Sequence, residues 1–156
     1  MTNNDVLRSL RYILDIKDAD MVGLFALGGS HVEAKDVKQM LLFETDRSFQ
    51  ICPDELMASA LDGLVYSKRG KDESRPALPQ EFPITNNMVL KKFRVAFELK
   101  DSDMHEILEG MGFPISKPEM SAIFRKAGHK NYKECGDQFL RNFFKGLAQR
   151  VRVVAE

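Results

Sequence analysis

Residues 2–4 have the sequence TNN and residues 17–21 have KDADM; TNN returns at residues 85–87 and KDSDM at residues 100–104. Both pairs of motifs are separated by the same 83 positions. The same shift aligns one half of the chain with the other without a gap. A self-match at one fixed period indicates that one supersecondary unit is used twice.

The match continues outward from these motifs over nearly 70 positions. It pairs Gly29 with Gly112, Cys52 with Cys135, Asp54 with Asp137 and Gly63-Leu64 with Gly146-Leu147. Between the halves lies a segment with Pro76, Pro79 and Pro83, which disfavours helix and predicts a semi-extended linker. We therefore expect copy one over residues 1–69, the linker over 70–84 and copy two over 85–156.

Each copy is predicted to form four helices, because apolar residues recur at helical spacing and no long alternating pattern is present. The fold class is therefore all-α, a tandem duplication with about eight helices. Asn3 and Asn86 are the expected N-caps of the first helix in each copy. Asp18 and Asp101 are the expected caps of the second helix, and Gly29 and Gly112 are expected to end it, in a left-handed conformation.

A helix-turn-helix-like element is a further candidate in each copy. In copy two the first helix would cover Asp103 to Met111, the turn Gly112 to Ser116, and the recognition helix Lys117 to Lys126. Ser116 is its expected N-cap, with Glu119 three residues later as a capping box. The turn is longer than the usual three to four residues, which weakens the case for groove insertion. Copy one has Ala34 to Phe43 at the place of the recognition helix.

A longer stretch of copy two, GHKNYKECGDQFLRNF at residues 128–143, together with the TNN and KD-x-DM motifs, resembles the bacterial YehS-like family. That family consists of uncharacterised proteins with two copies of one helical domain. The resemblance covers essentially the whole chain and implies a duplicated helical architecture in a bacterial cytosolic setting. It brings no established activity, so it implies no catalytic residue.

Charge is distributed unevenly along a chain whose formal net charge is zero. Residues 1–84 carry a net charge of −4 and residues 85–156 a net charge of +4. Residues 117–152 contain nine Lys or Arg against three Asp or Glu. A basic half can bind phosphates although the whole chain is neutral, so this segment favours nucleic acid, either DNA or RNA, as partner.

The candidate nucleic-acid-binding residues are cationic, or are side chains that hydrogen-bond to or stack on nucleic acid. They are Lys117, Arg125, Lys126, His129, Lys130, Asn131, Tyr132, Lys133, Arg141 and Lys145. A basic face neutralised by the acidic copy one is the alternative without a ligand. A second function is a protein-interaction or regulatory module that uses an apolar groove between the repeats, or a homodimer formed through Leu41-Leu42-Phe43 of copy one.

Enzymatic chemistry finds little support, so we expect a non-enzymatic binding protein. The three His and two Cys lack the paired spacing of a zinc site, and no phosphate-binding glycine motif is present, so no metal and no cofactor is expected. Cys135 and His129 resemble a nucleophile and base, but Cys52 has Asp46 at the equivalent place. The pairs Asp18/Asp20 and Asp101/Asp103 fit helix starts better than acid–base catalysis.

The expected location is the cytoplasm, without membrane contact. No apolar run approaches the roughly 20 residues that span a bilayer. The first residues lack the basic and apolar regions of a secretory signal. Cys52 and Cys135 are expected to be reduced, partly buried thiols.

Overall fold

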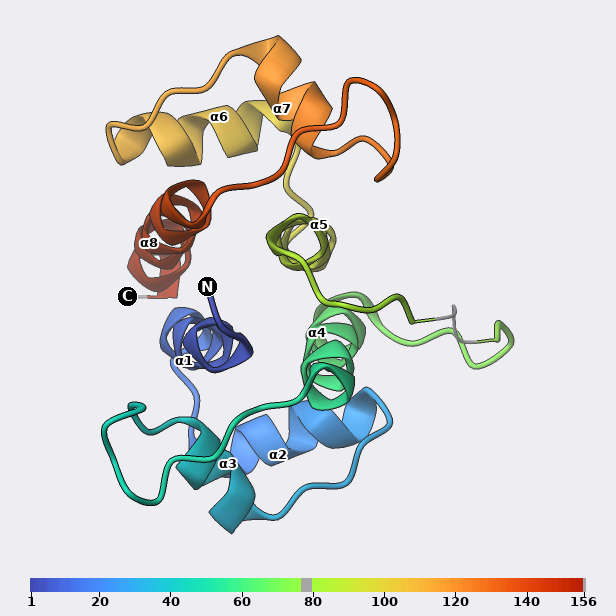
Figure 1. Ribbon diagram of the computed structural model, residues 1–156, viewed down its shortest axis with the longest axis vertical. Helices are drawn as coiled ribbons and strands as arrows, with labels where there is room; N and C mark the ends of the chain where they lie inside the picture. Colours follow the sequence, from blue (N-terminus) through green and yellow to red (C-terminus); the bar gives the residue numbers. More distant parts are fainter. Residues whose placement is uncertain (77–79, 156) are drawn as a thin grey trace. The chain divides into compact units, whose positions relative to one another are not determined.

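The computed structural model describes the backbone of residues 1–76 and 80–155. That part of the chain contains eight helices and no strand (Figure 1). It divides into two compact units, Met1–Ile84 and Thr85–Glu156. The all-α prediction is confirmed.

The two units have the same order of helices. The first contains α1 (Asn3–Leu14), α2 (Asp18–Leu27), α3 (Ala34–Met40) and α4 (Asp54–Arg69). The second contains α5 (Asn86–Ala96), α6 (Asp101–Gly110), α7 (Lys117–Ile123) and α8 (Asp137–Ala155). Every helix of the second unit begins 83 residues after its counterpart, which is the period of the sequence repeat. A tandem duplication of one four-helix unit is therefore present.

The first helix of each unit begins one residue earlier than its cap assignment predicted. The hydroxyl of Thr2 accepts a hydrogen bond from the Asp5 N–H at 3.1 Å, and that of Thr85 accepts one from the Met88 N–H at 3.2 Å. Thr2 and Thr85 are thus the N-caps of α1 and α5. The prediction of Asn3 and Asn86 was wrong, because both threonine and asparagine cap helices well and only the fold decides between neighbours.

The second helices also begin differently in detail. Lys17 and Lys100 are the N-cap residues of α2 and α6. The carboxylates of Asp20 and Asp103 accept hydrogen bonds from the N–H groups of Lys17 (3.0 Å) and Lys100 (2.8 Å). The acidic residues therefore satisfy helix starts, as expected, but Asp18 and Asp101 do not cap them. Gly29 (φ 101°) and Gly112 (φ 68°) have the predicted left-handed conformation after each helix.

The third helices are shorter than predicted. Helix α3 ends at Met40 rather than Phe43, and α7 ends at Ile123 rather than Lys126. The side-chain amide of Asn87 takes the Ile123 carbonyl at 2.9 Å, an acceptor that the next helical turn would need. Lys126 therefore lies in the following loop, not on a recognition helix. The N-cap of α7 is Ser116, as predicted.

The two units fill their cores differently. In the first, a Cβ on Gly63 would lie 1.9 Å from the Leu24 carbonyl oxygen, and one on Gly28 would lie 1.8 Å from that of Ser59. The backbones of α2 and α4 therefore touch, and only glycine fits at either place. At Gly146, the counterpart of Gly63, the closest backbone atom is 2.7 Å away, so this contact is looser.

Aromatic rings fill the space between α5 and α8 in the second unit, where the first unit has Leu10, Ala60 and Leu61 at the equivalent positions. The ring centroid of Phe93 on α5 is 4.9 Å from that of Phe144 and 6.5 Å from that of Phe143, both on α8. All three rings are buried. Because large flat side chains stand where the first unit has smaller aliphatic ones, the second copy has diverged in its packing while keeping its helix starts.

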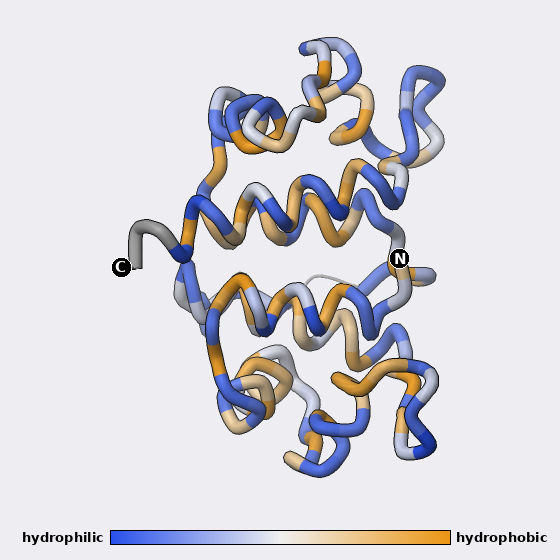
Figure 2. The backbone as a smooth tube through the Cα atoms, turned by 90° about the vertical axis from the view of Figure 1, so that its left-hand side faces the viewer, coloured by the Kyte–Doolittle hydropathy of each residue, from blue (hydrophilic) through white to orange (hydrophobic). Residues whose placement is uncertain are grey.

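Helix α8 is amphipathic, and polar and apolar positions alternate along much of the chain in Figure 2. On α8 the buried residues include Phe139, Leu140, Phe143, Phe144 and Leu147, whereas Arg141, Lys145 and Gln149 are exposed. This spacing gives the helix one apolar side and one polar side. None of the helices in residues 1–76 and 80–155 is long and apolar enough to cross a membrane.

The segment between α4 and α5 contains no helix over residues 70–76 and 80–85. Its end is attached to α4, because the Ile84 N–H donates to a carboxylate oxygen of Asp54 at 3.2 Å. The Gln80 side chain donates to Asp62 at 3.3 Å. Residues 77–79 of the predicted linker, including Pro79, lie outside the described residues.

Candidate functional site

Most of the predicted site residues lie in the loop between α7 and α8. We call residues 124–136 the basic loop and their counterpart, residues 41–53, the first-unit loop. The basic loop has a formal net charge of +3, whereas the first-unit loop has −1. Two loops at the same place of the same fold therefore present opposite charge.

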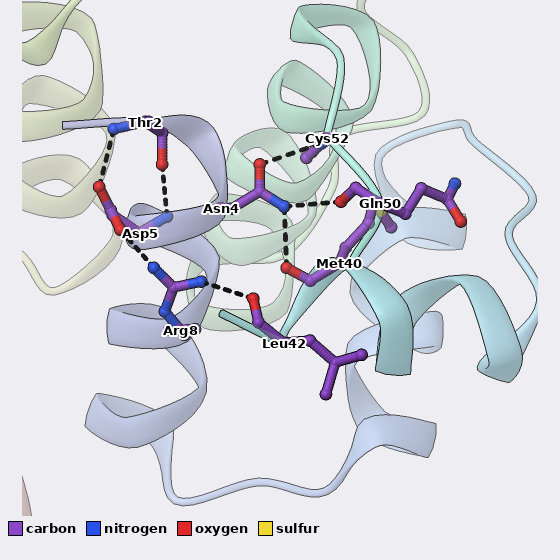
Figure 3. Close-up of polar contacts among 8 residues, drawn as sticks. All are labelled: Thr2, Asn4, Asp5, Arg8, Met40, Leu42, Gln50 and Cys52. Atoms are coloured by element: carbon purple, nitrogen blue, oxygen red, sulfur yellow. Dashed lines mark hydrogen bonds and ion pairs between the residues drawn. The ribbon is translucent and has the colours of Figure 1, made fainter. Parts of the chain in front are cut away.

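One asparagine fixes the first-unit loop at both ends (Figure 3). The side-chain amide of Asn4 donates to the carbonyl oxygens of Met40 and Gln50, both at 2.8 Å. Its own oxygen accepts a hydrogen bond from the Cys52 N–H at 3.1 Å. Because Asn4 is buried, it supplies partners that water cannot supply to these backbone groups.

The basic loop is fixed in the same way by the counterpart of Asn4. The Asn87 amide donates to the carbonyl oxygens of Ile123 and Lys133, both at 2.9 Å, and accepts from the Cys135 N–H at 2.8 Å. Asn86 adds hydrogen bonds to the Cys135 carbonyl at 3.0 Å and to the Asp137 carboxylate at 2.8 Å. The shape of the basic loop is thus set by α5.

The sequence interpretation missed this role of the asparagines. The signal was present, because the TNN motif is the first feature that the repeat preserves. Helix capping explained one polar residue of the motif and left the other two unexplained. A side chain that binds the backbone 36 to 49 residues away cannot be inferred from local spacing.

A tight turn inside each loop is closed by different residues. In the first unit a carboxylate oxygen of Asp46 accepts from the Ser48 N–H at 2.8 Å. In the second, the Nδ1 atom of His129 accepts from the Asn131 N–H at 3.0 Å. A neutral imidazole that accepts at Nδ1 carries its proton on Nε2. The exchange keeps the turn and removes one negative charge from the loop.

Two of the predicted cations brace the basic loop. The Lys133 ammonium is 3.0 Å from a carboxylate oxygen of Glu119 on α7. This ion pair and its hydrogen bond lower the pKa of Glu119, and the Ser116 hydroxyl lowers it further. The Arg125 guanidinium donates to the Asn131 carbonyl at 3.2 Å, across the loop. Lys133 and Arg125 therefore already have partners within the second unit.

Other predicted cations are exposed and have no such partner. Lys126 and Lys130 lie in the basic loop, Lys117 is the first residue of α7, and Lys145 lies on the polar side of α8. None of the four makes an ion pair or hydrogen bond with its side chain in the part of the chain that the structure describes. Arg141 is exposed one turn before Lys145. The ion pair between Lys133 and Glu119 joins the basic loop to α7. Arg141 and Lys145 lie on α8, the helix that follows the loop.

Tyr132 is half-buried, unlike its neighbours His129, Lys130 and Asn131, which are exposed. Burial raises the pKa of its phenol, and the charge of Glu134 adds to this rise. The first-unit loop has Phe49 at the same place, also half-buried. An aromatic ring at this position therefore helps to anchor both loops, and stacking of Tyr132 on a base stays a prediction.

Neither cysteine has the surroundings of a nucleophile. Cys52 and Cys135 are free thiols and buried. Burial raises the pKa of each to about 12, with a further contribution from the carboxylates of Asp54 and Asp137. Because the thiolate is the reactive form, both side chains are suited to packing rather than attack.

The carboxylate pairs also have structural partners. A carboxylate oxygen of Asp101 is 2.6 Å from the Arg94 guanidinium, and in the first unit Asp18 is 3.4 Å from Arg11. Asp103 is 2.5 Å from Arg150 in addition to its role at the start of α6. Among the residues with described positions, no group of three His, Cys, Asp or Glu side chains could hold a metal ion.

Comparisons with known proteins agree with this repeated geometry. A family model described as "Protein of unknown function (DUF1456)" matches the chain twice, over residues 3–70 and 86–152. The chain is 50% identical over 153 residues to "Uncharacterized protein YehS" of Escherichia coli (strain K12), and the match covers 98% of both chains. No solved structure matches the chain significantly. The YehS-like resemblance is confirmed, and the chain, with one matched segment in each unit, belongs to the DUF1456 family.

Proposed function

We propose that this protein is a non-enzymatic binding protein whose second unit binds nucleic acid through the phosphate backbone. The basic loop supplies Lys126 and Lys130, α7 supplies Lys117, and α8 supplies Arg141 and Lys145. Lysine and arginine contacts to phosphates provide most of the affinity of sequence-independent binding.

One observation supports the proposal above the others. Lys126 and Lys130 are exposed on a loop that Asn87, Arg125 and Lys133 hold in place. Neither lysine is neutralised by a carboxylate in the described part of the second unit. The first-unit loop is held by Asn4 in the same way but has a net charge of −1, so the exposed cations are what distinguishes the basic loop from its counterpart.

A catalytic function is less well supported. The candidate nucleophiles are thiols whose pKa is raised to about 12. The carboxylate pairs Asp18/Asp20 and Asp101/Asp103 serve helix starts and pair with Arg11 and Arg94. Packing of the thiols and the helix-start and ion-pair contacts of the carboxylates account for the positions of these groups.

Fluorescence anisotropy with a labelled 20-base-pair duplex at 50 mM salt tests the proposal. We expect a dissociation constant in the micromolar range and a steep loss of affinity with added salt. Lys126→Ala/Lys130→Ala should weaken binding at least about tenfold and lower the slope of log K against log salt by about 2. Absence of binding both to this duplex and to its separate strands at 100 µM protein would refute the proposal.

The first unit offers a matched control. Lys35 and Lys38 are exposed on α3, so Lys35→Ala/Lys38→Ala removes the same charge from the protein. This variant should bind with nearly unchanged affinity and salt slope. An equal loss in both double variants would mean that net charge, not the basic loop, determines binding.

A second candidate function is self-association through the first-unit loop. Phe43 and Ile51 are 70% and 73% exposed, although both are large and apolar. Their counterparts in the basic loop are Lys126 and Glu134. The net charges of −4 and +4 on the two halves make a second copy of this chain a complementary partner.

Sedimentation velocity over a range of protein concentrations tests this candidate. Self-association should appear as a rising sedimentation coefficient, and Phe43→Ser/Ile51→Ser should abolish it. A monomer at 100 µM in 150 mM salt would count against it.

A further inference from the structure

We infer that the second unit binds the phosphate backbone of a double-stranded nucleic acid rather than the unstacked bases of a single strand. The inference rests on the proposed function and specifies its ligand. It follows from three features of the second unit: the aromatic rings, the length of α7 and the rigidity of the basic loop.

Proteins that bind single strands without sequence preference place aromatic rings where bases can stack on them. The exposed Phe and Tyr side chains of the described chain are Tyr12, Phe43 and Phe82, all of which precede the second unit. Tyr132 is half-buried. Among its described residues the second unit therefore combines exposed cations with no fully exposed Phe or Tyr ring; the exposed imidazole of His129 accepts the Asn131 N–H within the turn of the basic loop.

The other rings of the second unit have partners inside it. The Arg94 guanidinium lies 4.6 Å from the ring centroid of Phe124, the residue that opens the basic loop. Phe113 makes an edge-to-face contact with Phe139, with centroids 5.9 Å apart. Stacking a base on either ring would require these contacts to be given up.

The third helix does not provide a groove-reading element either. Helix α7 has seven residues, and Met120 and Ile123 on it are buried. Arg125 and Lys126, which a longer helix would have presented to base edges, lie in the basic loop instead. Contacts that such side chains make to phosphates position a protein on nucleic acid and carry no sequence information.

The basic loop is held in one shape by contacts to α5 and α7. Asn87 binds the Lys133 carbonyl, Lys133 pairs with Glu119, and the Lys133 N–H donates to the Ala122 carbonyl at 3.1 Å. A fixed set of cations suits the regular and dense phosphates of a duplex, which has one charge per roughly 1.7 Å of axis. A flexible single strand would have to be ordered on binding.

Anisotropy titrations with a 20-base-pair duplex and with either of its single strands, at 50 mM salt, test the inference. The slope of log K against log salt is about −0.9 per phosphate contact for a duplex and about −0.7 for a single strand, so the five proposed contacts predict roughly twentyfold tighter duplex binding at 50 mM salt. Equal or tighter binding of the single strands would overturn the inference and leave the proposed function standing. Binding to neither ligand would refute the proposed function itself.

Two further readings separate backbone binding from base recognition. Two duplexes of unrelated sequence should bind within about threefold of each other, because phosphates are the same in both. Tyr132→Leu should leave single-strand affinity within about twofold, after circular dichroism has established that the variant is folded. A loss of tenfold or more in that variant would demonstrate base stacking and contradict the inference.

Discussion

Asn4 and Asn87 make the same three hydrogen bonds, 83 positions apart. Each side-chain amide donates to two loop carbonyls, of Met40 and Gln50 or of Ile123 and Lys133. Each amide oxygen accepts the N–H of the cysteine that precedes the fourth helix by two residues. Both copies thus keep the same three asparagine hydrogen bonds that fix the loop, while the exposed residues of the loop have diverged.

Removing the asparagine side chain should destabilise the first unit more than the second. Asn4 is buried and Asn87 is half-buried, so water can replace the lost partners only in the second unit. We expect Asn4→Ala to cost about 3 kcal/mol of unfolding free energy and Asn87→Ala about 1–2 kcal/mol. Urea unfolding followed by circular dichroism measures both, and Gln149→Ala on the exposed side of α8 is the control. Losses below 0.5 kcal/mol would mean that the loops hold their shape without the asparagines.

The contact between α2 and α4 predicts a strong effect at one glycine. Gly63→Ala would place a Cβ against the Leu24 carbonyl, so the helices must separate, at a cost of about 3 kcal/mol. Gly23→Ala, in the same pair of helices, meets no atom within 4 Å and should be neutral or stabilising by about 0.5–1 kcal/mol. Thermal unfolding distinguishes the two variants. Equal melting temperatures would contradict the close approach of the helices.

The aromatic core of the second unit makes a similar prediction. Phe143 is fully buried between α5 and α8, where its ring meets that of Phe93 edge-on. Phe143→Ala should lower the unfolding free energy by about 3–5 kcal/mol. Phe43→Ala removes the same side chain from a position that is 70% exposed and should cost less than about 1 kcal/mol. If the two losses were similar, Phe143 would not belong to the core.

The buried thiols predict a loss of stability at high pH. The pKa of Cys52 and Cys135 is about 12 in the folded chain against an ordinary value of 9.0. Above pH 9 the unfolded chain releases these protons and the folded chain keeps them, so stability falls between pH 9 and 12. From pH 8 to pH 10 each thiol should account for a loss of roughly 1 kcal/mol. Urea unfolding of the wild type and of Cys52→Ala/Cys135→Ala at pH 8 and pH 10 measures the contribution of the thiols. An equal loss of unfolding free energy in the two proteins would contradict the prediction.

The repeat could be predicted from the sequence because two segments that align without a gap are expected to adopt the same fold. The repeat period matches the spacing of the helix starts, as Asp54 and Asp137 at the starts of α4 and α8 illustrate. It could not choose between Thr2 and Asn3 as cap, since both residue types favour that position. Nor could it end α7 at Ile123, because the side chain that takes the Ile123 carbonyl comes from α5.

The sequence predicted which cationic residues make up the candidate site, but not how they are arranged in space. The excess of cations between Lys117 and Arg152 is visible in the sequence. The pairing of Lys133 with Glu119, and the exposure of Lys126 and Lys130 without such a partner, depend on how the basic loop folds back on α7. Long-range contacts of this kind have no signature in local spacing.

The location of the binding surface is measured most directly by nuclear magnetic resonance. A ¹⁵N-labelled sample titrated with a 20-base-pair duplex at 50 mM salt should show shift changes at the backbone amides of residues 124–136 and at Lys117. The chemical shifts of the amides of residues 41–53, which occupy the same place in the first unit, should not change. Changes confined to residues 41–53, or none at all at saturating duplex, would contradict the account.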